Sequence, residues 1–175
     1  VICRKCQAKV RGVCRGSRVT GRISEWIQIR LGWRGMAADV DWNMLRRKAI
    51  DASANAYAPY SRFRVGAAAL VDDHRMVAGC NVENVSYGLG LCAECAVVCA
   101  LHSGGGGRLV ALSCVGPDGE VLMPCGRCRQ VLLEHGGPEL LIDHPQGPKP
   151  LRELLPDAFG PDDLARARRP VEETP

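Results

Sequence analysis

A chain of 175 residues with 46% hydrophobic and 24% charged residues is long enough for one domain with a sizeable core, and its composition is that of an ordinary globular protein. Residues 1–35 carry seven Arg, two Lys and one Glu, so they account for more than the whole net charge of +4 and leave a mildly acidic body. An acidic body argues against a broad nucleic-acid-binding surface, and without a run of about 18 apolar residues the sequence predicts no membrane span.

Residues 1–35 differ from the rest of the chain. They are basic, show no clear periodicity and contain Cys3-x-x-Cys6 with Cys14 further on. A small zinc knuckle and an Arg-rich transit peptide are two interpretations of such a stretch. Because Met36-Ala37-Ala38 resembles a natural start, we expect residues 1–35 to be upstream sequence or an added extension that is poorly ordered.

The first periodic segment begins at Asp41, a candidate helix N-cap. An apolar stripe at helical spacing follows and predicts an amphipathic helix. The helix should end before Pro59, because proline disfavours helical backbone at the residue that precedes it. The stripe consists of Leu45, Ala49, Ala52 and Ala56.

Two strands are predicted next, at 63–71 and 76–82, with a short hairpin at 72–75 between them. Asn81 and Glu83 fall where the second strand ends. A carboxylate accepts from a hydroxyl and a carboxamide donates or accepts, so the pair suits a polyhydroxylated ligand. From the residues alone, a polar strand end that faces water is the simpler interpretation.

The remaining elements alternate between helix and strand. Four glycines at 104–107 form a link rather than a phosphate-binding loop, because a strand-like segment follows them where such a loop needs a helix. We expect a domain at 36–165 and a loose tail at 166–175. The predicted elements are a helix from Cys92 to about Ser103, a strand at 109–115, a helix from Cys125 to about His135 and short strands at 140–143 and 149–151.

Three cysteines, Cys92, Cys125 and Cys128, fall at the starts of two predicted helices and make a plausible zinc site. Three protein ligands leave the fourth position of a tetrahedral zinc open for water, which is the catalytic arrangement, and zinc lowers the pKa of that water to about 7. Glu94 could move protons beside the metal without binding it. No segment suggests a secretory signal, so ten cysteines favour metal binding and burial in a reducing cytoplasm over disulfides.

Four linked motifs follow one another along the chain: Phe63-Arg64-Val65-Gly66-Ala67, Asn81-Val82-Glu83-Asn84, Cys92-Ala93-Glu94 and Pro124-Cys125-Gly126-Arg127-Cys128-Arg129-Gln130. In these motifs the chain resembles the zinc-dependent cytidine deaminases, in the branch with three cysteine ligands. The resemblance runs from about residue 41 to about residue 159. It implies an α/β fold, a three-layer α-β-α sandwich with a mixed five-stranded sheet.

The same resemblance implies a reaction. Free cytidine and deoxycytidine would be hydrolysed to uridine and deoxyuridine with release of ammonia, as in pyrimidine salvage. A zinc-bound hydroxide would attack the base and Glu94 would shuttle the protons, with one zinc per subunit. Asn81 and Glu83 would hydrogen-bond the sugar hydroxyls, Phe63 would lie against the nucleoside, and the backbone near Ala93 would help hold the base.

The short three-cysteine members of this group are homotetramers whose active sites cross subunit boundaries. Phe159 matches the aromatic residue that reaches a neighbour's nucleoside, and Tyr87 is a second candidate for such a contact. The expected partners are therefore a nucleoside and further copies of the chain, with no nucleic acid and no membrane.

The chain departs from a common pattern of this group at Cys95, where many relatives carry Arg directly after the catalytic Glu. Zinc with three thiolates has a formal charge of −1, so the helix N-termini and Arg129 are expected to offset it, Arg129 by donating a hydrogen bond to a sulfur. If Cys95 were a fourth ligand, the zinc site would be closed and structural.

Two other functions remain open at this point. An interaction module of the zinc-ribbon type would use Cys3, Cys6, Cys125 and Cys128, and would leave Glu94 without a role. Polynucleotide and deoxycytidylate deaminases usually present His at the first ligand position, where this chain has Cys92. The acidic body also lacks the aromatic and basic groove that binds single-stranded nucleic acid.

Overall fold

The computed structural model describes residues 40–167, so the expectations for residues 1–35 lie outside the described part. The elements in chain order are α2 (Trp42–Ser53), β1 (Gly66–Val71), β2 (Met76–Cys80), the 3₁₀ helix η1 (Tyr87–Leu89), α3 (Ala93–Ser103), β3 (Leu109–Val115), α4 (Gly126–Gly136), β4 (Leu141–Ile142), β5 (Lys149–Pro150), α5 (Leu151–Leu154) and α6 (Pro161–Ala167). Because α6 continues to Ala167, the tail predicted from residue 166 begins inside a helix. Each helix described is too short or too polar to span a lipid bilayer.

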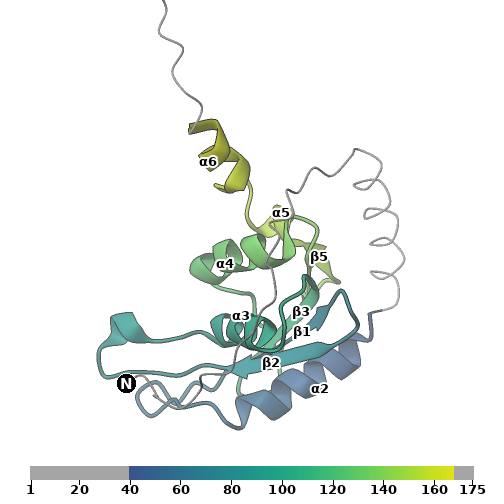
Figure 1. Cartoon of the computed structure of the whole chain (residues 1–175). Helices are drawn as coiled ribbons and strands as arrows, with labels where there is room; N and C mark the ends of the chain where they lie inside the picture. Colours follow the sequence, from purple (N-terminus) through teal and green to yellow (C-terminus); the bar gives the residue numbers. More distant parts are fainter. Residues whose placement is uncertain (1–39, 168–175) are drawn as a thin grey trace, which may run out of the picture.

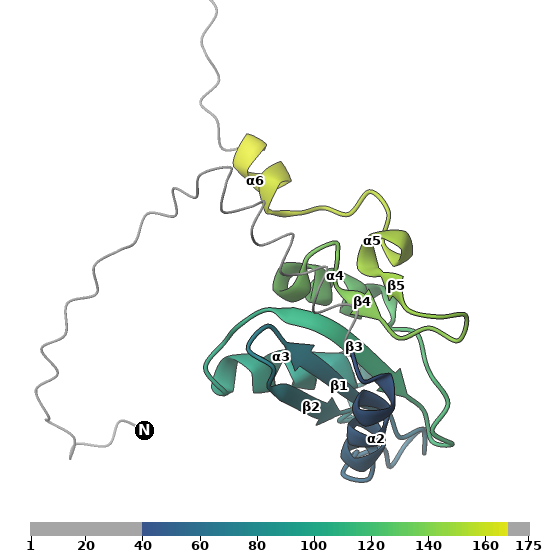
Figure 2. The ribbon, with the colours of Figure 1, turned by 90° about the vertical axis from the view of Figure 1, so that its right-hand side faces the viewer.

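The five strands form one mixed sheet in the order β2-β1-β3-β4-β5. The pairings of β1 with β2, of β1 with β3 and of β4 with β5 are antiparallel, and β3 pairs with β4 in parallel. Helix α2 covers one face of this sheet, and α3 and α4 cover the other (Figures 1 and 2). The three-layer sandwich with a mixed five-stranded sheet is therefore confirmed.

The side chains of β1 point alternately to the two faces of the sheet, so this strand contributes to both layers of the core. Ala67 and Ala69 pack with the side chains of α3 and α4, whereas Ala68 packs with Leu45 and Ala49 of α2. Successive side chains of a strand point to opposite faces, so a strand covered on both sides must be apolar throughout. The small alanine side chains let both helical layers lie close to the sheet.

Helix α2 begins at the predicted N-cap, because the Asp41 carboxylate accepts a hydrogen bond of 2.9 Å from the backbone N–H of Met44. It ends at Ser53, earlier than the predicted end before Pro59. Four residues further on, the N–H of Tyr57 donates to the carbonyl of Asn81, and this bond draws the chain towards the end of the sheet.

The first two strands are shorter than predicted, and the side chain of Asn81 explains where β1 begins. Its Oδ1 accepts from the N–H of Val65 at 2.8 Å, and its Nδ2 donates to the carbonyl of Phe63 at 2.9 Å. These bonds occupy backbone groups that a longer strand would have paired with β2, so β1 begins only at Gly66. A Cβ at Gly66 would collide with the carbonyl oxygen of Ala49, so α2 can approach β1 this closely only at a glycine.

A buried ion pair ties α2 to the sheet. The Asp143 carboxylate, which is fully buried just after β4, accepts two hydrogen bonds of 2.7 Å from the Arg46 guanidinium and one of 2.8 Å from the Ser113 hydroxyl. A buried carboxylate is tolerated only when it is paired in this way.

We expect Arg46→Met to lower the free energy of unfolding by about 2–3 kcal/mol, because it leaves the buried Asp143 carboxylate without its cation. Arg46 is itself partly open to solvent, so water replaces some of the lost contacts and the expected cost stays below the upper end for buried pairs. Urea unfolding measures the difference, with Arg47→Met on the exposed side of α2 as the matched control. Equal losses in the two variants would contradict this role.

Candidate metal centre and active site

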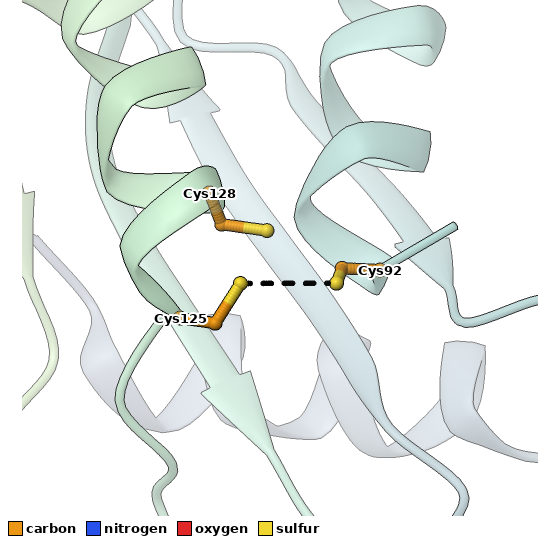
Figure 3. Close-up of side chains that lie close together, drawn as sticks. All are labelled: Cys92, Cys125 and Cys128. Atoms are coloured by element: carbon orange, nitrogen blue, oxygen red, sulfur yellow. Dashed lines mark hydrogen bonds between the residues drawn. The ribbon is translucent and has the colours of Figure 1, made fainter. Parts of the chain in front are cut away.

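Three cysteine side chains meet at the N-terminal ends of α3 and α4. Cys92 is the N-cap of α3, Cys125 is the N-cap of α4, and Cys128 lies in the first turn of α4. Their sulfur atoms lie within 4.8 Å of one another, and the Sγ atoms of Cys92 and Cys125 are 3.9 Å apart. Figure 3 shows the three side chains pointing towards a common centre between the two helices.

This geometry fits zinc. A tetrahedral zinc with Zn–S bonds of about 2.3 Å separates its sulfur ligands by about 3.8 Å, close to the distance between Cys92 and Cys125. Thiolates are soft ligands that favour zinc over magnesium or calcium. Within residues 40–167 no other group of three potential ligands from His, Cys, Asp and Glu gathers in this way, and Cys95 is not part of the group. The geometry therefore provides three sulfur ligands and leaves a fourth position open.

The pKa values of the three thiols are shifted in different directions by their surroundings. Burial raises the pKa of Cys92, and it raises the pKa of the fully buried Cys128, where the Glu94 carboxylate adds to the effect. Burial also acts to raise the pKa of Cys125, but hydrogen bonds from Cys128, above all from its backbone N–H, outweigh burial and lower that pKa. Cys125 at the helix start is thus the thiol that ionises most readily.

Glu94 lies beside this centre in the first turn of α3 and is only 4% exposed. A cavity of about 420 Å³ opens over it. Most of the predicted site residues line this cavity, together with apolar side chains that the sequence interpretation did not single out. The predicted residues along its wall are Phe63, Asn81, Glu83, Tyr87, Cys92, Ala93, Glu94 and Cys125.

Cys114 is a cavity residue that the sequence analysis missed. It lies on β3, it is buried, and it lines the cavity together with Glu94 and Met123. The alternation of side chains along β3 could have identified Cys114 as a residue of this face. Cys114 follows Leu112 by two residues, and both face the layer of α3 and α4. Burial, followed by the charge of Glu94, raises the pKa of Cys114, so this thiol stays protonated.

Comparison with known proteins places the chain in a family. The model of the cytidine and deoxycytidylate deaminase zinc-binding region matches residues 41–142. The chain belongs to this deaminase family. It is 78% identical over 131 residues to the cytidine deaminase of Mycobacterium tuberculosis strain H37Rv, a match that covers 75% of this chain and 98% of the relative.

Solved structures agree with this assignment. The crystal structure of cytidine deaminase from Mycobacterium tuberculosis matches with a TM-score of 0.69 and 79% identity, over 70% of this chain and 99% of that one. The structure from Mycobacterium leprae matches with a TM-score of 0.67 and 58% identity, over 67% of this chain and 99% of that one. The α/β fold is thus the deaminase fold that the motifs implied.

Two polar residues of the deaminase cavity are bound to their own chain. Both polar ends of the Asn81 side chain contact the backbone of residues 63–65. The Glu83 carboxylate accepts hydrogen bonds from the Ser61 hydroxyl and from the N–H groups of Tyr60 and Ser61, at 2.9 and 3.2 Å. These bonds, first the one from the Ser61 hydroxyl, lower the pKa of Glu83, so it faces the cavity as a carboxylate that accepts hydrogen bonds.

The two aromatic residues predicted to reach a neighbouring subunit are both largely exposed. Tyr87 is 82% exposed and lies at the cavity wall, whereas Phe159 is 63% exposed and is not among the cavity residues. The carbonyl of Phe159 accepts a hydrogen bond of 2.8 Å from the Gln130 side chain, which anchors its backbone to α4. Phe159 of this chain therefore lies outside the cavity.

Arg129 differs from the sequence prediction in its contacts. Its Nε donates to the carbonyl of Pro124 and its Nη1 to the carbonyl of Leu154, both at 2.8 Å, so within the described residues its hydrogen bonds reach no sulfur. The hydrogen bond from Arg129 to a sulfur that the sequence suggested is not among these two and stays a prediction. Arg129 holds the segment before Cys125 to α5, and its influence on the charge of the thiolates is left as a prediction.

We expect Arg129→Gln to lower zinc content and turnover more than Cys95→Ala, because it removes a cation near the thiolates and two bonds that hold the segment before Cys125. Cys95 lies outside the group of three sulfur ligands. Zinc analysis and turnover of both variants test this. Normal zinc content and turnover in Arg129→Gln, together with loss of activity in Cys95→Ala, would contradict the role given to Arg129.

Proposed function

We propose that the chain is a zinc-dependent cytidine deaminase, which hydrolyses free cytidine and deoxycytidine to uridine and deoxyuridine and releases ammonia. One observation carries the proposal: a group of three sulfur ligands with an open fourth position borders, through Cys92 and Cys125, the cavity that the buried carboxylate of Glu94 also lines. A structural zinc site needs neither the cavity nor a carboxylate that does not bind the metal. The similarity to cytidine deaminases named as such supports the same substrate class.

In this proposal Cys92, Cys125 and Cys128 hold the zinc, one ion per subunit. Zinc bound there would act as a Lewis acid and would supply a water molecule that ionises near neutral pH. The net reaction joins the oxygen of that water to C4 of the cytosine and breaks the bond from C4 to the amino nitrogen. A donor and acceptor of protons is therefore needed close to C4.

Glu94 is placed for that task. Its carboxylate would take one proton of the attacking water and deliver it to the ring nitrogen N3. It would then take the second proton from the oxygen added at C4 and deliver it to the amino group, which leaves as ammonia. Because Glu94 is buried beside the sulfur ligands, bulk water competes little for these protons. Every proton removed from water thus ends on the base or on ammonia, and Glu94 returns to its starting state.

The rest of the cavity would hold the nucleoside. The backbone at Ala93 would help hold the base, and the Phe63 ring would lie against the nucleoside. Asn81 and Glu83 would meet the sugar hydroxyls, with the Glu83 carboxylate accepting hydrogen bonds as it now does from Ser61. A cavity of about 420 Å³ is of the size typical for a small ligand.

Full-length, zinc-loaded protein should be incubated with cytidine, and the change in ultraviolet absorbance on conversion to uridine should be followed. Parallel reactions contain deoxycytidine, deoxycytidylate and a cytosine-containing oligonucleotide. The proposal expects turnover of the two nucleosides. Turnover of only the nucleotide or the oligonucleotide would contradict it, as would a zinc-loaded protein without activity.

We further propose that the enzyme is a homotetramer acting in pyrimidine salvage in the cytoplasm. Several large apolar side chains are exposed in the segment between β2 and α3 and near the C-terminus. A second copy of the chain would cover them. Thiol ligands that must stay reduced are consistent with a cytoplasmic setting. The most exposed of the apolar residues are Val85, Tyr87, Leu89 and Phe159.

Subunit mixing tests whether Phe159 completes a neighbour's site. Chains with Phe159→Ala and chains with Glu94→Ala, each poorly active alone, should regain activity when they are unfolded together and reassembled, because some mixed sites then hold both residues. Glu94→Ala mixed with Cys128→Ala is the control, since both changes affect the same subunit's site and cannot complement each other. Activity at the parental average in the first mixture would place Phe159 in its own subunit.

A further inference from the structure

Two histidines meet at the ends of α3 and α4 opposite to the cysteines. The Nε2 atom of His102 lies 3.1 Å from the Nδ1 atom of His135. Each histidine stands in the last turn of its helix, ten residues after the cysteine that caps the start of that helix. Since a helix rises about 1.5 Å per residue, this pair lies roughly 15 Å from the cysteine centre. The same two helices therefore carry clustered metal-binding side chains at both ends.

The geometry of the two rings suits a shared cation. A straight hydrogen bond of 3.1 Å between two imidazoles would place the ring centroids about 5.4 Å apart. The centroids of His102 and His135 are only 4.8 Å apart, with the ring planes at 70°. The nitrogens are therefore not aligned head-on, so an ion placed beside the line between them would contact both. A metal about 2.1 Å from each nitrogen would subtend an angle of roughly 95°.

The electrostatics at this end of the helices also favour a cation. The C-terminal ends of α3 and α4 both carry the negative end of a helix dipole, and their last carbonyl groups face this region. Burial, together with the neighbouring His102, lowers the pKa of His135 despite the opposing charge of Glu134, so this imidazole is neutral and free to bind a metal near pH 7. His102 is exposed, which leaves the other coordination positions open to water.

We propose that His102 and His135 form a second metal site, which takes a divalent transition-metal ion through two imidazole nitrogens with water as the remaining ligands. The angle near 95° suits the square-planar or octahedral geometry of Ni²⁺ or Cu²⁺ better than tetrahedral zinc. An ion bound there links the C-terminal ends of the two helices whose N-terminal ends bear the cysteines. The site stabilises the fold and takes no part in deamination, so it is independent of the function proposed above.

Nickel is the suitable probe, because Cu²⁺ would oxidise the thiols. Zinc-saturated full-length protein is titrated with Ni²⁺ by calorimetry in a buffer that does not chelate metals, and thermal unfolding is recorded with and without Ni²⁺. We expect one Ni²⁺ to bind per subunit and to raise the unfolding temperature. The X-ray absorption spectrum of the bound nickel should show scattering from two imidazole rings.

Variants identify the ligands. His102→Gln and His135→Gln should each weaken Ni²⁺ binding at least about tenfold and remove the thermal shift, because a single imidazole loses the advantage of the preorganised pair. His74→Gln, at an exposed hairpin histidine, is the matched control and should change neither. Cys99→Ser, one helical turn before His102, should also leave the affinity unchanged. Turnover of cytidine stays the same in all four variants.

Several outcomes would overturn the assignment. Ni²⁺ binding of equal strength in the wild type and in both histidine variants would place the nickel elsewhere. Loss of binding in Cys99→Ser with retention in His135→Gln would replace the two-histidine site by another ligand set. Absence of Ni²⁺ binding to the wild type would show that the pair is only a hydrogen bond between two imidazoles.

Discussion

Replacing Glu94 by glutamine is expected to lower the turnover of cytidine by about 10²–10⁴-fold, while zinc content and thermal stability remain unchanged. Glutamine has nearly the shape of glutamate, so it fits the same buried position in the first turn of α3. It cannot take a proton from water or deliver one to the base. Because Glu94 is not one of the sulfur ligands, the metal should be retained.

Glu83→Gln is the matched control for this experiment. Glu83 lines the same cavity, but it is only partly buried and its carboxylate binds the segment at residues 60–61. We expect its substitution to raise KM more than it lowers kcat, which is the signature of lost binding. Near-normal kcat in Glu94→Gln, or equal losses of kcat in the two variants, would refute the proton-transfer role of Glu94.

The cysteine centre was predictable because its positions depend on local structure. Cys92 and Cys125 each precede a short helical segment, and both became N-caps as expected. The strand at 109–115 between the two helices was also predicted with its observed bounds. A fully buried strand between two helices returns the second helix to the same face of the sheet as the first, and this brings the cysteines together.

Contacts between distant side chains and backbone groups could not be predicted in this way. Arg129 donates to the carbonyl of Leu154, which is 25 residues away and belongs to a different helix. The side chain of Asn81 ends the pairing of β1 early by binding backbone that periodicity assigned to a strand. Such bonds depend on where the fold brings two segments, and no spacing within either segment encodes that.

The ion pair of Arg46 with Asp143 and the contact of His102 with His135 belong to the same class. Their partners are separated by 97 and 33 residues. Each residue alone suggests only a polar position on a helix or at a strand end. The pairing becomes visible once α2 is placed on one face of the sheet and α3 and α4 on the other.

Removing the thiol of Cys128 is expected to abolish zinc binding and, with it, the activity. Cys128→Ala leaves two sulfur ligands of the three, and we expect the affinity for zinc to fall at least about 100-fold. Cys128 is fully buried, so no solvent-exposed group can take its place at the metal. Because burial raises the pKa of this thiol in the metal-free chain, protons compete with zinc most strongly here, and zinc occupancy should fall as the pH falls.

Cys114→Ala separates loss of a ligand from loss of packing. Cys114 is also a buried cysteine, it lines the cavity beside the metal centre, and its truncation leaves a void of the same size as that of Cys128. Since Cys114 lies outside the group of three sulfur ligands, its variant should retain zinc and lose only about 1 kcal/mol of stability. Zinc analysis after dialysis against a weak chelator distinguishes the two variants. Equal zinc loss in both would mean that burial of the cavity wall, rather than the third sulfur, holds the metal.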